Sequence, residues 1–343
     1  MQPNPQSLGY RMPAEWEKHS AIWLSWPHDA VTFPDRVEKV EKTYTEIIQA
    51  ISGSELVNLF MRNAEEEKRI SEILKAAGVN LTQVKFWKHN YADVWFRDYG
   101  PIFVKNAAGE LAITHWIFNA WGSKYATLMP DTIIPKIINE KLQLPYFTPG
   151  IVMEGGSIEV NGLGTLLTSK QCLLNPNRNP TLTQAEIEKK LAENLNITNF
   201  IWLEEGIAGD DTDGHIDDIA RFVNPTTVVC TIEKNTKDPN YAILQRNLEI
   251  LKAAKDQDGK PLEIITLPTP IVEDSEGRLP ASYTNFYIGN TVVLVPIFSD
   301  KNDAAALEIL QKLFPERKVV GINCRDLVYG LGTLHCISQQ QPE

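Results

Sequence analysis

Residues 155–174 read GGSIEVNGLGTLLTSKQCLL, two β-rich runs on either side of a glycine-containing turn. This pattern predicts a β-hairpin. It recurs in GPIFVKNAAGELAITHWIF (100–118), IARFVNPTTVVCTI (219–232) and NFYIGNTVVLVPI (285–297). Each turn contains an asparagine, and successive asparagines stand 55, 63 and 66 residues apart: Asn106, Asn161, Asn224 and Asn290. A spacing of this length indicates a repeated supersecondary unit.

Helical patterns lie between and beyond these hairpins. Four of them are Thr181–Leu195, capped by Thr181 or Thr183, Asp238–Ala254, Asp303–Phe314 and a shorter one at Asp131–Leu142. The runs left over, SAIWLSW (20–26), LVNLFM (56–61), KVVGIN (318–323) and LHCI (334–337), are expected to form a fifth unit where the termini meet. Helices 37–51 and 64–77 should pack outside it. We therefore predict a five-bladed α/β propeller, one closed domain over residues 1–343, with an ordinary mixed α/β sheet as the alternative.

Composition limits the classes of function. A formal charge of −11 argues against a nucleic-acid partner and favours the approach of cationic substrates. The N-terminus lacks a signal-peptide pattern, and eighteen apolar residues never occur together, so we expect a cytoplasmic protein with no membrane contact. The four cysteines show no CxxC spacing, which argues against a zinc ribbon or a dense disulfide framework.

A polar cluster stands just before each hairpin: WFRDYG, MEGG, GDDTDGHIDD and ASYTN. Equivalent positions of a propeller face its central axis, so the reactive residues of these clusters and of the C-terminal stretch should converge there. They are Asp98, Glu154, His215, Asp217 and Cys336. We expect His215 and Asp217 on one face of an extended strand, because side chains alternate along a strand.

Carboxylates crowded into a pocket repel one another unless a cation lies between them. A guanidinium suits such a pocket, because its fork of donors matches paired carboxylates. Cys336 would then attack the guanidinium carbon, and His215 would protonate the departing ammonia and later activate water. The acidic surroundings should raise the pKa of Cys336, so we also expect the bound cation, aided by His215, to help generate the thiolate.

At these residues the sequence resembles a known family. The motifs on which this resemblance rests are MPAEWEKHSAIWLSWP, DVWFRDYGP, MEGGSIEVNGLGTLL, GDDTDGHIDDIARF, PASYTNFYIGN and HCISQQQP. They are similar to those of the agmatine deiminase and Porphyromonas-type peptidylarginine deiminase family of the pentein superfamily, nearly end to end. The resemblance implies a five-bladed propeller, no metal or other cofactor, and often assembly as a homo-oligomer.

The resemblance also implies roles. Cys336 would be the nucleophile, His215 the general acid and base, and Glu154 a partner of guanidinium and histidine. Asp98 and Asp217 would clamp the guanidinium. Trp95 would wall the pocket around the substrate's alkyl chain. The chain has GLGT (330–333) and PHDAVTF (27–33) where agmatine-specific members typically carry GGGN and PERxDNW, which bears on the far end of the substrate.

Other residues have weaker signals. Tyr283 and Asn285 are expected at the pocket rim, from their place in the fourth repeat. Cys172 is expected in an apolar hairpin strand, and His335 on the strand face opposite Cys336 with a structural role.

Three activities remain open. The first is hydrolysis of agmatine to N-carbamoylputrescine and ammonia, favoured because an acidic pocket suits a dication. The second is the same chemistry on free or C-terminal peptidyl arginine, or amidino transfer, which would call for a pocket arginine to hold the α-carboxylate. The third is a metal-dependent amidohydrolase with zinc or manganese on His215, Asp217, Asp98 and Glu154.

Overall fold

The computed structural model describes residues 3–343, whose strands form five small sheets. Four of the sheets have three strands each, in the orders β4-β5-β6, β7-β8-β9, β10-β11-β12 and β13-β14-β15. Their strands are β4 (Ile102–Lys105), β5 (Leu111–Thr114), β6 (Tyr146–Phe147), β7 (Ile158–Val160), β8 (Thr165–Ser169), β9 (Asn199–Leu203), β10 (Ala220–Asn224), β11 (Thr227–Ile232), β12 (Glu263–Pro268), β13 (Tyr287–Ile288), β14 (Val292–Ile297) and β15 (Lys318–Asn323). The predicted five-unit α/β architecture is therefore confirmed.

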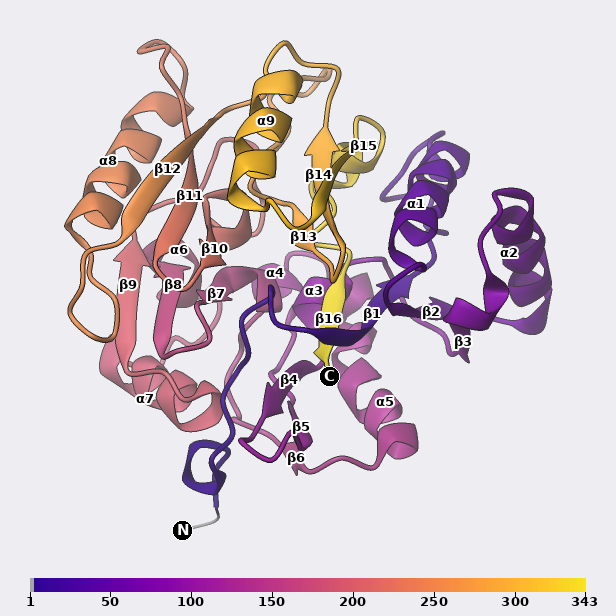
Figure 1. Cartoon of the computed structure of the whole chain (residues 1–343), viewed down its shortest axis with the longest axis horizontal. Coiled ribbons are helices and arrows are strands. Elements are labelled where there is room, and N and C mark those ends of the chain that lie inside the picture. The colour runs from indigo at the N-terminus through magenta and orange to yellow at the C-terminus, as the bar shows by residue number, and fades with distance from the viewer. Residues whose placement is uncertain (1–2) are drawn as a thin grey trace.

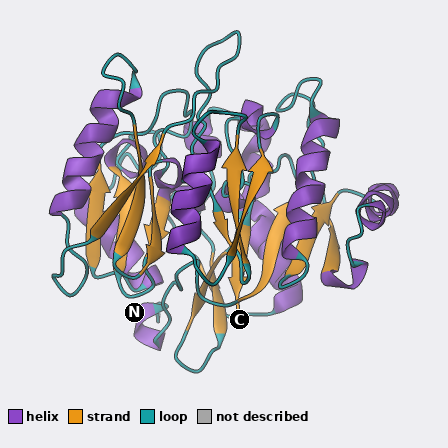
Figure 2. Ribbon diagram, turned by 45° about the horizontal axis from the view of Figure 1, so that its top comes forward, coloured by secondary structure: helices purple, strands orange, loops and turns teal. Residues whose placement is uncertain are grey.

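Each of these four sheets is built in the same way. The first two strands are the predicted antiparallel hairpin, and the third strand runs parallel to the second. A parallel neighbour needs a crossover connection, which here contains a helix. Figure 2 shows the helices packed beside the strands. In Figure 1 the strands β12, β11 and β10 follow one another toward the middle of the molecule, so the first hairpin strand of that unit is the innermost.

The fifth sheet joins the two ends of the chain. Its strand order is β16-β1-β2-β3, with β16 (Gln339–Pro342), β1 (His19–Ser25), β2 (Leu56–Met61) and β3 (Val84–Lys88). The C-terminal β16 runs antiparallel to β1, with Gln339 opposite Trp23 (Figure 1). The first and last strands of the chain meet in one sheet, and this pairing closes the ring.

Two predictions about the fifth unit are wrong. The segment KVVGIN is β15, which pairs with β14 because the crossover through α9 (Asp303–Leu313) returns it to the fourth sheet. The segment LHCI (334–337) is a turn, in which the amide of Ile337 donates to the carbonyl of Thr333. All four residues of this turn are buried, so its sequence is a short apolar run like that of a buried strand.

The helices are α1 (Val37–Ile51), α2 (Ala64–Ala76), α3 (Phe96–Tyr99), α4 (Ala120–Ser123), α5 (Ile134–Leu142), α6 (Lys170–Leu173), α7 (Gln184–Leu195), α8 (Asn240–Ala253) and α9 (Asp303–Leu313). The six predicted helices are α1, α2, α5, α7, α8 and α9, which lie close to their predicted bounds, whereas the short helices α3, α4 and α6 were not predicted. Thr183 rather than Thr181 caps α7, through a reciprocal capping box with Glu186. The predicted helix at 131–142 begins later, because residues 126–133 form a 3₁₀ turn around Pro130.

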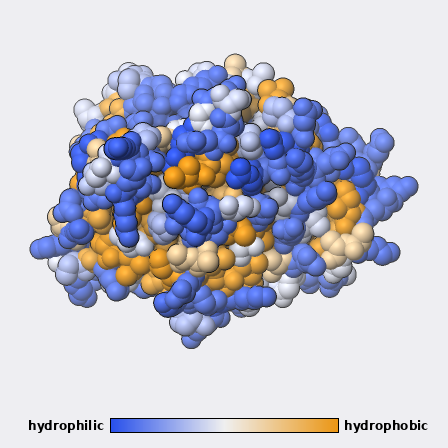
Figure 3. All heavy atoms as spheres, turned by 90° about the horizontal axis from the view of Figure 1, so that it is seen from above, coloured by the Kyte–Doolittle hydropathy of each residue, from blue (hydrophilic) through white to orange (hydrophobic). Residues whose placement is uncertain are grey.

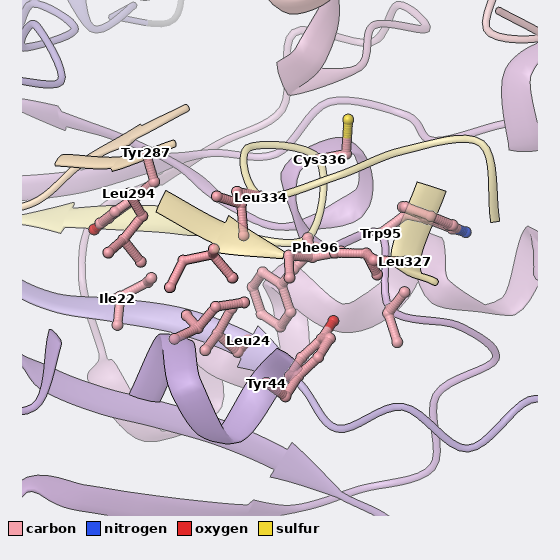
Figure 4. Packing of buried hydrophobic residues seen from close by; sticks show 14 of the residues in the cluster. Ile22, Leu24, Tyr44, Trp95, Phe96, Tyr287, Leu294, Leu327, Leu334 and Cys336 are labelled. Atoms are coloured by element: carbon pink, nitrogen blue, oxygen red, sulfur yellow. The ribbon is translucent and has the colours of Figure 1, made fainter. Parts of the chain in front are cut away.

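The apolar core lies between the sheets and their helices. Figure 4 shows part of the largest cluster, where Ile22, Leu24, Phe96 and Leu334 pack together while the side chain of Cys336 points away from them. The face in Figure 3 is hydrophilic over most of its area, with hydrophobic atoms gathered toward one edge. Among residues 3–343, no helix is both long and apolar enough to cross a membrane.

Candidate active site

Short polar turns in front of the hairpins carry the candidate side chains. Asp98 lies in α3, Glu154 precedes the 3₁₀ turn Gly155–Ser157, and Asp217 lies in the 3₁₀ turn Ile216–Asp218. In Figure 1, α3 and α4 lie near the middle of the ring. The sequence pattern before each hairpin thus places these side chains at the centre.

The space around Gly156 shows how closely the candidate side chains approach one another. A methyl group on this residue would stand 2.6 Å from His215 Nδ1, 2.8 Å from Asp98 Oδ1 and 3.2 Å from Asp217 Oδ2. Three candidate residues from three different segments therefore surround one backbone position. Only glycine leaves room for them there.

His215 and Asp217 come together for a different reason from the predicted one. The expectation of an extended strand at GHIDD is wrong, because residues 216–218 form a 3₁₀ turn. The backbone amide of His215 donates to Asp210 Oδ2 and Thr212 Oγ1, so the acidic loop before it positions the histidine. The tight turn, rather than strand alternation, brings the two side chains to the same site.

Asp98 is held by two neutral donors and one histidine. Its Oδ1 accepts from the amide of Gly156 at 3.0 Å, and its Oδ2 accepts from Trp121 Nε1 at 3.0 Å. His215 Nδ1 lies 3.7 Å from Oδ1. Burial raises the pKa of Asp98 to about 6, although the charge of His215 acts in the opposite direction.

Trp121 was not anticipated from the sequence. It belongs to a short run, residues 120–123, in which every φ is positive, and its own φ is 53°. A left-handed conformation costs an ordinary residue roughly 1–2 kcal/mol. Such strain is typical of functional sites, and here it brings the indole to Asp98.

His215 is completely buried, and its Nε2 has no hydrogen-bond partner among residues 3–343. Burial lowers its pKa, but the charge of Asp98, the thiol of Cys172 and the charge of Glu154 outweigh burial. The net pKa of His215 is well above its ordinary value. A protonated imidazole is the state that a general acid requires.

Glu154 forms a buried ion pair and lies close to His215, with their potential metal-ligating atoms within 4.8 Å of each other. Its Oε1 accepts from Arg178 Nε at 2.6 Å, and both side chains are fully buried. Cys172 Sγ lies 4.0 Å from Glu154 Oε2. Cys172 therefore lies beside the site, in α6, and the expectation that it belongs to a hairpin strand is wrong.

Cys336 lies in a turn that Asn285 holds in place. Asn285 Nδ2 donates to the sulfur at 3.1 Å, while its Oδ1 accepts from Thr333 Oγ1 at 2.7 Å and from the amide of His335 at 3.0 Å. Asn285 thus lies beneath the thiol and is completely buried, rather than at the pocket rim.

The thiol of Cys336 is 3.8 Å from Asp217 Oδ2. Burial and the negative charges of Asp217, Asp218 and Asp98 raise its pKa well above the ordinary value. The predicted effect of the acidic surroundings on this thiol is thus confirmed in direction. A thiolate here needs a compensating positive charge.

A cavity of about 210 Å³ leads to the sulfur. Cys336, Asp98 and Trp95 line it, and Trp95 contributes the predicted aromatic wall. The charged residues among its lining are Asp29, Asp93, Asp98 and Asp211; within the described chain, no arginine or lysine lines it. Tyr283 is absent from this lining, because its buried hydroxyl donates to Asp303 at 2.7 Å, so its prediction as a rim residue is wrong.

Two groups of side chains could hold a metal ion by distance alone. They are Glu154, Cys172 and His215, and Asp217, Asp218 and Cys336. Arg178 already occupies an oxygen of Glu154, and its positive charge disfavours a second cation beside it. His335 Nδ1 similarly lies 2.7 Å from Asp217 Oδ2. These contacts fit a site for an organic cation better than one for a metal.

A ring of five small sheets, four of which begin with a hairpin, around a buried thiol, histidine and carboxylates defines a pentein-type fold. A sequence model of the Porphyromonas-type peptidyl-arginine deiminase family matches residues 11–342. The chain belongs to that family. An amidinotransferase from Microseira wollei is similar in fold alone, at 13% identity and a TM-score of 0.53.

Individual relatives are similar over their whole lengths. A Legionella pneumophila (strain Paris) protein, provisionally named agmatine deiminase, is 40% identical over 99% of this chain and 97% of its own. The structure of agmatine deiminase from Enterococcus faecalis has a TM-score of 0.93 at 33% identity, covering 100% of this chain and 98% of its own. A substrate-bound agmatine deiminase from C. jejuni has a TM-score of 0.88 at 32% identity, covering 97% of this chain and 96% of its own.

Proposed function

We propose that this protein is an agmatine deiminase, a hydrolase that converts the guanidinium of agmatine to a ureido group and releases ammonia. The products are N-carbamoylputrescine and ammonium. The observation that carries the proposal is the sign of the charges around the cavity, which are all negative. Agmatine carries two positive charges, whereas arginine adds an α-carboxylate that these aspartates would repel.

The arginines that could have bound a carboxylate are engaged elsewhere. Arg178 pairs with Glu154 and Asp213, Arg221 with Glu15 and Glu159, Arg97 with Glu15, and Arg325 donates to the carbonyl of Phe298. The full-length relatives named above as agmatine deiminases support the same substrate.

The chemical steps follow from the contacts. The guanidinium lies between Asp98 and Asp217. The thiol of Cys336 loses its proton to solvent as this cation binds, and the thiolate sulfur attacks the guanidinium carbon to form a C–S bond. The C–N bond then breaks, and protonated His215 gives its proton to the leaving ammonia. Neutral His215 takes a proton from water, which attacks the same carbon, and breaking the C–S bond restores the thiol and releases the ureido product.

Asp29, Asp93 and Asp211 supply negative charge for the ammonium at the other end of agmatine. Asp211 accepts from Tyr125 at 2.5 Å, which holds its carboxylate at the cavity. Trp95 covers the methylene chain between the two charges.

The test is a ureido-product assay with agmatine, free arginine and a peptide ending in arginine, each with a chelator present. We expect product from agmatine, with kcat/KM at least about 100-fold above arginine, or about 3 kcal/mol of discrimination. Preference for either arginine substrate would overturn the proposed substrate. Activity that the chelator abolishes and Cys336→Ala retains would favour a metal-dependent amidohydrolase.

A further inference from the structure

His335 lies between two carboxylates behind the proposed substrate site. Its Nδ1 is 2.7 Å from Asp217 Oδ2, and its Nε2 is 2.8 Å from Glu15 Oε2. The residue is only 1% exposed. A neutral imidazole has one donor and one acceptor, so it cannot donate to two ionised carboxylates. Both contacts form together only in an imidazolium.

Glu15 is ionised in this setting. Its Oε2 lies 3.0 Å from Arg221 Nη2 and 3.4 Å from Arg97 Nη2. Burial raises the pKa of Glu15, but the charges of Arg221, His335 and Arg97 outweigh burial and hold the pKa well below its ordinary value. Glu15 therefore accepts a hydrogen bond from His335 and does not donate one.

The charges of the surrounding cluster balance when His335 is positive. Arg221 Nε donates to Glu159 Oε2 at 2.6 Å, which adds one more ion pair to the side chains linked through Glu15 and His335. Three carboxylates then face three cations: Glu15, Glu159 and Asp217 against Arg97, Arg221 and His335. A buried cluster with no net charge avoids the cost of an isolated buried ion.

The two oxygens of Asp217 are in different situations. His335 binds Oδ2, whereas Oδ1 is buried and has no hydrogen-bond partner among the described residues. Burial raises the pKa of Asp217, but the hydrogen bond and charge of His335 outweigh burial and lower it. The contact fixes the rotation of the carboxylate and leaves one oxygen to accept from a guanidinium.

We propose that His335 is a positioning residue: as an imidazolium between Glu15 and Asp217, it keeps Asp217 ionised and presents Asp217 Oδ1 to the guanidinium of the substrate. The inference rests on the proposed function and deepens it. His335 is next to the nucleophile Cys336 in the sequence, and the sequence pattern alone predicts only a structural role for it. The inference gives it a role in binding the substrate.

The main test compares His335→Asn with the wild type. The shorter amide can still donate to Asp217 but carries no charge. We expect KM for agmatine to rise at least about tenfold. We also expect the acid limb of kcat/KM, which Asp98 alone sets in the wild type, to become steeper, because Asp217 then takes a proton more readily and adds a second protonation to the limb. A structural role alone would lower the amount of folded enzyme and leave both quantities unchanged.

Two further variants separate charge balance from positioning. Glu15→Gln with His335→Asn removes one charge of each sign, so we expect it to recover thermal stability but not the KM or the acid limb. The matched control is His19→Asn, because His19 is also buried against a carboxylate, Glu55, but has no contact with Asp217. It should leave both kinetic quantities unchanged.

The protonation state is tested without turnover, in ¹⁵N-histidine NMR spectra of the wild-type enzyme at about pH 7.5. We expect both ring nitrogens of His335 to carry hydrogens, with the signal assigned from its shift in Glu15→Gln. A neutral ring would overturn the inference, as would wild-type KM and acid limb in His335→Asn. A wild-type enzyme inactive on agmatine but with a doubly protonated His335 would instead overturn the proposed function alone.

Discussion

Binding of a guanidinium should lower the pKa of Cys336 and so increase the fraction of this thiol that is present as the thiolate. Asp217 Oδ2 lies 3.8 Å from the sulfur, and two unit charges at that distance repel by about 4 kcal/mol at an effective dielectric constant of about 20. This energy corresponds to about three pKa units. A cation bound between Asp98 and Asp217 offsets a repulsion of this size between the thiolate and Asp217. Burial of the thiol continues to raise its pKa. We therefore expect the pKa of Cys336 to fall by at least about one unit on binding.

The assay is an ultraviolet titration of thiolate, with the spectrum of Cys336→Ala subtracted to remove the three other cysteines. Methylguanidinium is the ligand, in samples where product analysis finds no turnover. Methylurea, which has the same shape without the charge, is the control. A titration midpoint that methylguanidinium and methylurea leave equally unchanged would refute the electrostatic origin of the thiolate.

Three other predictions concern the residues around the guanidinium. Asp98→Asn and Asp217→Asn should each lower kcat/KM for agmatine by at least about 100-fold, because each leaves a buried cation without one of its partners; near-native rates would show that the clamp is wrongly assigned. Gly156→Ala should abolish turnover, because its methyl group would stand 2.6 Å from His215 Nδ1, whereas Gly53→Ala, with nothing within 4 Å, should retain full activity. The kcat/KM profile should fall as the pH drops through about 6, because Asp98, whose pKa is raised to about 6, then takes a proton. Trp121→Phe removes a hydrogen-bond donor that lowers the pKa of Asp98, so it should move this acid limb to higher pH. An acid limb at the wild-type pH would contradict the assignment of the limb to Asp98.

The regular features of this fold could be predicted from the sequence, because they depend on local patterns. Alternating apolar runs and asparagine turns such as Asn161 specify the hairpins, and the polar residues before each hairpin specify which side chains face the centre. Closure of the ring was predicted, but the wrong C-terminal segment, LHCI, was assigned to it. The closing strand is β16, whose sequence QQQP has little strand propensity and pairs with β1 only through tertiary contacts.

The parts of the site that were missed depend on long-range contacts or unusual backbone. Trp121 reaches Asp98 from a left-handed turn that carries no sequence signature. Asn285 supports the thiol across 51 residues of sequence, and Cys172 approaches Glu154 from a helix after the hairpin. The repeat pattern identified the segment that contains Asn285, but it could not show that Asn285 rather than Tyr283 contacts the site. The hydroxyl of Tyr283 donates to Asp303 instead.

The central claim is that deimination proceeds through a covalent bond to Cys336. The most direct measurement is the intact mass of enzyme quenched in acid during turnover of agmatine, followed by peptide mapping. We predict a species heavier than the free enzyme by agmatine less one ammonia, located on Cys336 and absent from Cys336→Ala, which should make no product. Product formation by Cys336→Ala, or an adduct on a different residue, would contradict the account.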